Sequence, residues 1–240
     1  AKRGGHLLRF GGAQDVDGQA GLEGTGGGDR LAGAARAGGR AAHVRESLAF
    51  AKQLIPSIRT ACFMTNDVPA GRALRAQVEE EKETYPVKVG AFHLIKNTRG
   101  IDALAKNGHS ACDTILIDSL EGIVDDAARP LNNKEVLEAL RKVYGGPILG
   151  GNRYQVEQGA WAAVVKTGHE QGETSAEMLL KAMRGTPVAR IPVVSNVRGQ
   201  RVINVTALEA HEVVLKPTIL RGATMVRQQP YRRARGSVSH

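Results

Sequence analysis

The chain has 240 residues and carries 33 basic against 24 acidic side chains, a formal net charge of +9 at pH 7. Hydrophobic residues make up 42% and charged residues 24%, which excludes a collagen, a coiled coil and a wholly disordered chain. No apolar run approaches the roughly 20 residues that a membrane-spanning helix needs, so the chain is not predicted to be transmembrane.

The first 44 residues differ in composition from the rest. They hold 13 of the 29 glycines and few large apolar side chains, so we predict that 1–44 is a disordered or foreign segment. A shifted reading frame in GC-rich DNA would also produce such a leader. Gly24–Asp29 resembles a phosphate-binding loop only superficially, because no strand precedes it and no Gly-Lys-Ser/Thr ends it. No apolar region follows the basic start, so no signal peptide is predicted in this chain.

From Val44 onward, short apolar strands alternate with amphipathic helices. The predicted helices cover residues 44–55, the region of Leu74 and Val78, 101–106, a segment from Asn132 or Asn133 to Gly145, and 174–183. The predicted strands cover residues 59–64, 87–95, 113–118, 147–149, 161–165, 190–194 and 201–205. This order predicts an α/β fold of right-handed βαβ units, with a parallel sheet covered on both faces.

The basic end does not indicate a nucleic-acid partner. Residues 227–240 carry four arginines and no acid, and we interpret them as a basic flexible tail. Residues 45–226 keep an excess of only three positive charges, so the body of the chain lacks the basic surface of a nucleic-acid-binding protein.

Polar residues follow several of the predicted strands. In parallel sheets, ligands bind beyond the carboxyl ends of the strands. We therefore expect the ligand-binding residues among those that stand at these ends: Asn66, Asp67, Asp118, Ser119 and Asn152.

No pattern indicates catalysis, a metal or a cofactor. No two of the seven histidines have metal-ligand spacing, there is no Cys-x-x-Cys, and Ser119 has no Gly-x-Ser-x-Gly context. We expect a protein that is not an enzyme and holds no cofactor or metal. Asp118 with Ser119 leaves open an active-site pair in an α/β enzyme, the other interpretation being a carboxylate that caps the next turn.

Four other features receive structural interpretations. Cys62 and Cys112 are expected to be buried free thiols, although their distance in space does not follow from the sequence. His93 and Trp161 lie on apolar strands and are expected in the core. The pair at 125–126, both aspartates, is expected on the solvated face of a helix.

Four segments occur in an order that is typical of one family. They are a helix, Ile-Pro and a strand ending in Asn (48–66); Cys-Asp-Thr-Ile-Leu-Ile (112–117); Gly-Pro-Ile-Leu-Gly-Gly-Asn (146–152) with Gly-Ala-Trp-Ala-Ala-Val (159–164); and Met-Arg-Gly-Thr-Pro-Val-Ala-Arg-Ile-Pro-Val (183–193) with Ile-Asn-Val-Thr (203–206). Together they resemble the substrate-binding proteins of ABC transporters, in the branch that includes the tryptophan and tyrosine binders.

The resemblance implies a type I periplasmic-binding fold, with two Rossmann-like lobes and a ligand cleft between them. Residues 45–155 would form the ligand-binding lobe, and 156–226 would return into a first lobe that is only partial. The implied function is to hold a small solute, an amino acid or similar, for an ABC permease in the membrane. The implied location is periplasmic or otherwise extracytoplasmic.

Three departures from the family leave alternatives open. Leu120-Glu121-Gly122 stands where the family has Asp-Asn-Thr, Asn152 stands where it has Asp, and most of the first lobe has no counterpart in the chain. The remaining alternatives are an extracytoplasmic sensor domain of the same fold and a truncated copy without function.

Overall fold

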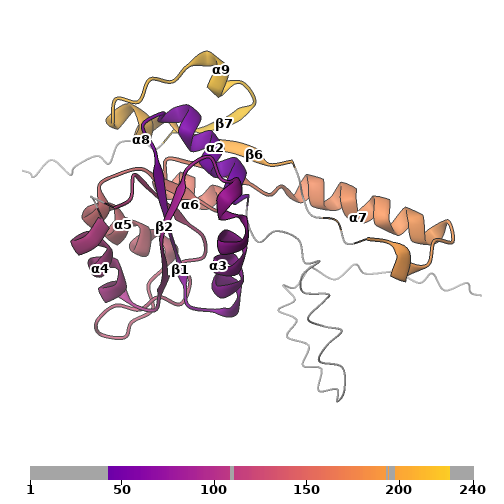
Figure 1. Ribbon diagram of the computed structural model, residues 1–240, viewed down its shortest axis with the longest axis horizontal. Coiled ribbons are helices and arrows are strands. Elements are labelled where there is room, and N and C mark those ends of the chain that lie inside the picture. The colour runs from indigo at the N-terminus through magenta and orange to yellow at the C-terminus, as the bar shows by residue number, and fades with distance from the viewer. Residues whose placement is uncertain (1–42, 109–110, 193, 195–197, 228–240) are drawn as a thin grey trace, which may run out of the picture. The chain divides into compact units, whose positions relative to one another are not determined.

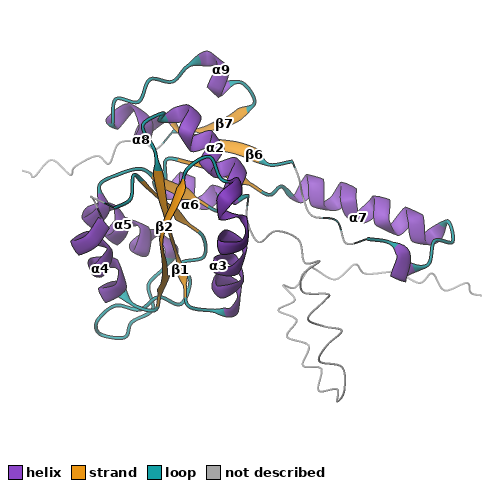
Figure 2. Ribbon diagram, in the orientation of Figure 1, coloured by secondary structure: helices purple, strands orange, loops and turns teal. Residues whose placement is uncertain are grey.

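The computed structural model describes residues 43–108, 111–192, 194 and 198–227 (Figure 1). In this part of the chain one sheet contains seven strands, in the order β2-β1-β3-β4-β5-β6-β7. Figure 2 distinguishes the strands, in orange, from the helices, in purple. The strands are β1 (Thr60–Asn66), β2 (Lys88–Ile95), β3 (Thr114–Ile117), β4 (Ile148–Gly150), β5 (Ala162–Val165), β6 (Gln200–Asn204) and β7 (Ala223–Val226). The predictions for residues 1–42 and 228–240 lie outside the described residues.

Helices cover both faces of this sheet. The helices of the described residues are α2 (Val44–Leu54), α3 (Pro69–Glu81), α4 (Thr98–Gly108), α5 (Asn133–Tyr144), α6 (Arg153–Gln158), α7 (Gly168–Met183), α8 (Val205–Ala210) and α9 (Pro217–Leu220), with 3-10 turns η1 (Lys82–Thr84) and η2 (Val188–Arg190). Figure 1 shows α4 and α5 on one side of β1 and β2, and α3 on the other. Two apolar clusters fill the two faces, one under α2 and α3 and one under α4 and α5. The predicted α/β class is therefore confirmed.

The sheet is parallel except at one pair of strands. β1 to β5 run in one direction, whereas β6 is antiparallel to β5 and carries β7 parallel to itself. Val165 at the end of β5 lies opposite Gln200 at the start of β6. The segment 166–199 therefore leaves the sheet at the end of β5 and returns to it at the same end of the sheet. This connection explains why β6 runs antiparallel to β5, which the strand pattern did not predict.

Local sequence signals determine α5. The Asn132 side chain accepts a hydrogen bond from the Glu135 amide (3.0 Å), and the Glu135 carboxylate accepts one from the Asn132 amide (2.9 Å). This capping box begins the helix, and Gly145, with φ 67°, ends it in the left-handed conformation that glycine favours. The predicted helix from Asn132 or Asn133 to Gly145 is confirmed.

The predicted strand over 190–194 is wrong. Val188–Arg190 forms a 3-10 turn instead, directly after Pro187. Pro192 lies inside the predicted range and has no backbone N–H to donate to a neighbouring strand, so this apolar run is a poor strand.

The interpretation of Asp125 and Asp126 as a helix face is also wrong. The Asp125 carboxylate accepts hydrogen bonds from the amides of Ala127 (3.0 Å) and Arg129 (2.9 Å), and Ala128 has φ 60°. An aspartate that binds nearby backbone in this way stabilises a tight turn in competition with a helix.

The cysteines are not free thiols. Cys62 on β1 and Cys112 just before β3 form a disulfide, with their Cα atoms 5.6 Å apart. The parallel register pairs Ala61 with Thr114 and so brings the two cysteines together. The sequence did not predict the bond because it does not give the order of the strands.

The two other structural interpretations have different outcomes. Trp161 belongs to the core, as predicted, and packs against the His211 ring with the ring centroids 4.4 Å apart. His93 lies on the edge strand β2 and is only half-buried, and this burial lowers the pKa of its imidazole.

Candidate functional site

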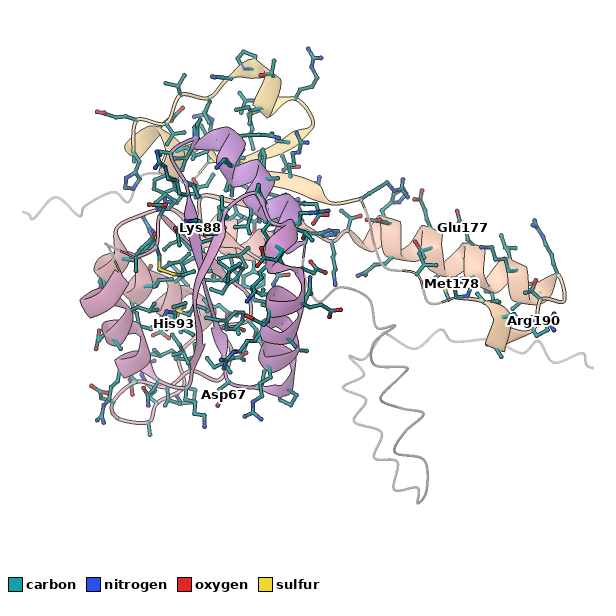
Figure 3. All side chains as sticks on the ribbon, in the orientation of Figure 1. Asp67, Lys88, His93, Glu177, Met178 and Arg190 are labelled. Atoms are coloured by element: carbon teal, nitrogen blue, oxygen red, sulfur yellow. A yellow bond between two sulfur atoms is a disulfide. The ribbon has the colours of Figure 1, made fainter. Side chains whose placement is uncertain are left out.

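The five predicted ligand-binding residues lie at the carboxyl edge of the sheet. Asn66 ends β1 and Asp67 follows it, Asp118 and Ser119 follow β3, and Asn152 follows β4. Figure 3 places Asp67 at the end of the sheet opposite Lys88, which begins β2. Because β1, β3 and β4 are parallel neighbours, residues separated by up to 86 positions share one edge.

Asn66 joins the ends of β1 and β3. Its Nδ2 donates to Ser119 Oγ (3.2 Å) and to the Glu121 carbonyl (2.7 Å), and its backbone amide donates to the Ser119 carbonyl (2.9 Å). The Asn66 side chain is buried, and both amide protons of its Nδ2 are used within the protein. Asn66 and Ser119 therefore hold the carboxyl ends of β1 and β3 together.

Asp67 is held by two cations. Its carboxylate lies 2.9 Å from Arg72 Nε and 3.2 Å from Lys96 Nζ. Hydrogen bonds from Arg72 and then Lys96 lower the pKa of Asp67, so the carboxylate is charged at neutral pH. Since Lys96 follows β2, this ion pair connects the loop after β1 to the end of the edge strand.

Asp118 lies in a different environment. Burial raises the pKa of its carboxyl group, against the opposing effects of the Ser119 amide and the Lys166 charge. A Cβ atom on Gly151 would lie 2.8 Å from Asp118 Oδ1, so only glycine leaves the carboxylate its space. Asp118 is thus a poorly solvated carboxylate at the centre of the edge, between β1 and β4.

Gln155 connects β3 to the turn after β4, and the sequence interpretation missed it. Its Oε1 accepts hydrogen bonds from the amides of Gly151 (2.8 Å) and Asn152 (3.1 Å), and its Nε2 donates to the Asp118 carbonyl. The side chain is fully buried. An asparagine followed three residues later by glutamine is a helix-start signal, and it could have identified Gln155.

The carboxyl edge brings several polar groups together. The edge offers one poorly solvated carboxylate, the Asn152 side chain and backbone groups fixed by Gln155 and Asn66. Within the described residues, no group of three His, Cys, Asp or Glu could hold a metal ion. A cavity of about 420 Å³, lined in part by Trp161 and His211, lies instead where β4 and β5 begin.

Comparison with known proteins identifies the family. The family described as "ABC transporter substrate binding protein" matches residues 41–227 of the chain. The chain belongs to this family. None of the curated proteins compared with the chain matches it.

Solved structures show that this family member has the type I periplasmic-binding fold. An ABC domain from Streptococcus pneumonia in complex with L-Trp is 21% identical, with a TM-score of 0.54, over 78% of this chain and 62% of that one. A ligand-free, open substrate-binding protein with adhesive properties from Clostridium difficile is 18% identical, with a TM-score of 0.56, over 78% and 60%. A conserved domain protein from Vibrio cholerae is 18% identical, with a TM-score of 0.55, over 78% of this chain and 60% of that one.

The substrate-binding chain described here thus spans about three fifths of the length of each of these structures. The family is one of substrate-binding proteins and one solved neighbour holds L-Trp, which agrees in general terms with the expectation that the chain is not an enzyme. Among the described residues, no helix has both the length and the apolar character to cross a bilayer.

Proposed function

We propose that the chain is the solute-binding component of an ABC importer and that it holds an amino acid or a similar small molecule above the carboxyl edge of the sheet. The observation that carries the proposal is Asp118, a half-buried carboxylate at the centre of the carboxyl edge whose pKa is raised by its burial. An ammonium group that replaces the solvation lost by burial would gain more from Asp118 than from Asp67, which already has Arg72 and Lys96. The neighbour that binds L-Trp supports an amino acid as the solute.

We also propose that the segment 166–199 belongs to the partial first lobe predicted for 156–226 and that this lobe closes over the carboxyl edge. Three passages of the chain lie together here: the Val164 amide donates to Ser47 at the start of α2 (3.2 Å), and Gly199 lies against Val164 and His43. Such a bundle of crossing segments is suited to a hinge.

The apolar side of α7 supports this arrangement. Gly172, Ala176, Leu179, Leu180 and Met183 follow a helical repeat and lie on one side of the helix, and only Glu170 of this helix is buried. Leu179 is 61% exposed and Met183 is 74% exposed. Val188, which follows the helix, is 77% exposed. A helix with this exposed stripe is suited to cover the sheet of another lobe. Figure 3 shows Glu177 and Met178 on α7.

The remaining parts of the proposal are the permease partner and an extracytoplasmic location. Membership of the family supports both. The Cys62–Cys112 disulfide adds independent support for the location, because structural disulfides persist in oxidising compartments and are rare in the cytosol.

A thermal-shift screen tests the proposed solute class. The screen compares each amino acid with the matched acid that lacks the amino group, for example L-tryptophan with indole-3-propionate. Ligand at about 100 times its Kd stabilises the folded state by about 2.7 kcal/mol, which raises the melting temperature by several degrees. We expect such a rise with at least one amino acid and its loss with the deaminated partner. A folded chain that responds to no amino acid, or equally to both partners, would contradict the proposal.

A further inference from the structure

The disulfide encloses one complete unit of the sheet. Cys62 lies in the middle of β1 and Cys112 stands two residues before β3, so the bond closes a loop of 50 residues. The loop contains α3, β2 and α4. We call residues 67–108 the edge unit, because β2 is the first strand of the described sheet and pairs only with β1 there.

The strand of the edge unit, β2, is less buried than the strands that follow β1 in the sheet. Every residue of β2 except Ile95 is at least partly exposed, whereas all residues of β3, β4 and β5 are buried. Segments with few buried contacts open locally at a lower free energy than the core of the same protein.

Direct contact connects the disulfide to the edge strand. A Cβ atom on Gly90 would lie 2.7 Å from Cys62 Sγ, so the backbone of β2 lies against the sulfur. The same Cβ atom would lie 3.2 Å from Thr60 Cγ2 and 3.5 Å from the Ala61 carbonyl oxygen. Cys62 is fully buried and Cys112 is 7% exposed, so β2 and the segments around it shield the bond from solvent.

We propose that the Cys62–Cys112 bond is a covalent clamp for the edge unit and that its reduction allows this unit to open while the sheet from β3 to β6 stays folded. The edge unit carries Asp67 and Lys96, whose ion pair borders the candidate site. The redox state of the two cysteines therefore controls whether the Asp67–Lys96 ion pair stays in place beside the candidate site. This last step rests on the proposed function, whereas the local opening does not.

The reaction is a thiol–disulfide exchange with an external dithiol. A thiolate of the dithiol attacks one sulfur and breaks the Cys62–Cys112 bond, which forms a mixed disulfide and releases the other cysteine as a thiolate. The second thiol of the reagent then attacks its own sulfur in the mixed disulfide and releases the remaining cysteine. Two electrons and two protons pass to Cys62 and Cys112, and the dithiol is oxidised to its own disulfide. Because both sulfurs are buried, attack requires a rare, transient exposure of the bond, so reduction of the native protein is slow. Once the bond is broken, we expect the edge unit to open far more often.

Hydrogen exchange measured by mass spectrometry on the oxidised and the dithiothreitol-reduced full chain tests the proposal. We expect reduction to increase exchange in β2 and α3 by about tenfold or more and to leave β4 and β5 nearly unchanged. An equal increase in all strands would show a merely global stabilisation and would overturn the clamp, as would no change in β2. The measurement needs no solute, so its outcome is independent of whether the solute proposal holds.

Substitution at Gly90 gives a second test. Gly90→Ala places a methyl group against Cys62 Sγ, so we expect it to lower the melting temperature strongly in the oxidised protein. In the Cys62→Ala/Cys112→Ala background the added methyl group has space, and we expect most of that loss to disappear. Gly172→Ala on α7, where nothing lies within 4 Å, is the matched control and should behave alike in both backgrounds. Equal losses for Gly90→Ala in both backgrounds would contradict the contact. If the cysteine-free variant does not fold, the reduced wild-type chain serves as the second background.

Discussion

The pKa of Asp118 connects the candidate site to pH. Burial raises this pKa, so the folded chain binds a proton here at a higher pH than the unfolded chain does. Folding disfavours the charged form of Asp118. The contribution of this residue to the free energy of unfolding therefore decreases as pH rises through the raised pKa. A bound ammonium group reverses the preference by stabilising the carboxylate.

We therefore expect solute affinity to increase as pH rises through the pKa of Asp118 and then to level off. Calorimetric titrations across the acidic range would measure this rise. The Asp118→Asn variant should bind more weakly at neutral pH and lose the pH dependence of affinity. Affinity that falls with increasing pH in the wild type would contradict a charged Asp118 as the partner of the solute.

Asn66 has a structural role that can be separated from solute binding. Asn66→Ala removes two hydrogen bonds between β1 and the segment after β3 and leaves the Glu121 carbonyl without its donor. We expect a loss of about 2 kcal/mol in the free energy of unfolding, measured by urea denaturation. A loss below the error of the measurement would mean that Asn66 does not join the two strands in solution.

The ends of α5 illustrate what local sequence determines at the scale of an element. Asn132→Ala removes the acceptor for the Glu135 amide, and we expect it to cost about 1 kcal/mol. Asn133→Ala is the matched control, since its side-chain oxygen is buried without a hydrogen-bond partner. Equal losses for the two variants, measured by urea denaturation, would show that the cap contributes nothing.

Elements with such local signals were predictable, and elements that depend on distant pairing were not. The capping box and Gly145 indicate α5 directly. In contrast, β7 has only four residues, none of them buried, and depends on β6 for its hydrogen bonds. The strand assigned to 190–194 shows the opposite error, because its apolar side chains were weighed more heavily than Pro192 within it.

The candidate site divides in the same way. Strand ends could be read from the sequence, so Asn66, Asp67, Asp118, Ser119 and Asn152 were placed at one edge correctly. Their separate environments could not be read, because Asp67 depends on Lys96 from β2 and Asp118 depends on the turn after β4. The disulfide was missed for the same reason, since it requires β3 beside β1.

At the scale of the whole molecule, the exposed side of α7 is the feature that most needs a partner. We expect this surface to bind an apolar dye such as ANS. The double variant Leu179→Ser/Met183→Ser should reduce dye fluorescence markedly without lowering the melting temperature, because both side chains are largely exposed. Val214→Ser, at a 76% exposed position outside 166–199, is the control. Unchanged fluorescence in the double variant would contradict an open apolar face on α7.

The most direct test of the central claim is isothermal titration calorimetry at neutral pH with the amino acid that gives the largest thermal shift. The wild-type chain is compared with Asp118→Asn and with Asp126→Asn, a control at an exposed carboxylate paired with Arg99. A charge-assisted contact with Asp118 predicts a loss of affinity of roughly 10- to 100-fold for Asp118→Asn and none for Asp126→Asn. Equal affinity of all three proteins, or no heat of binding with a folded wild-type chain, would contradict a solute site built on Asp118.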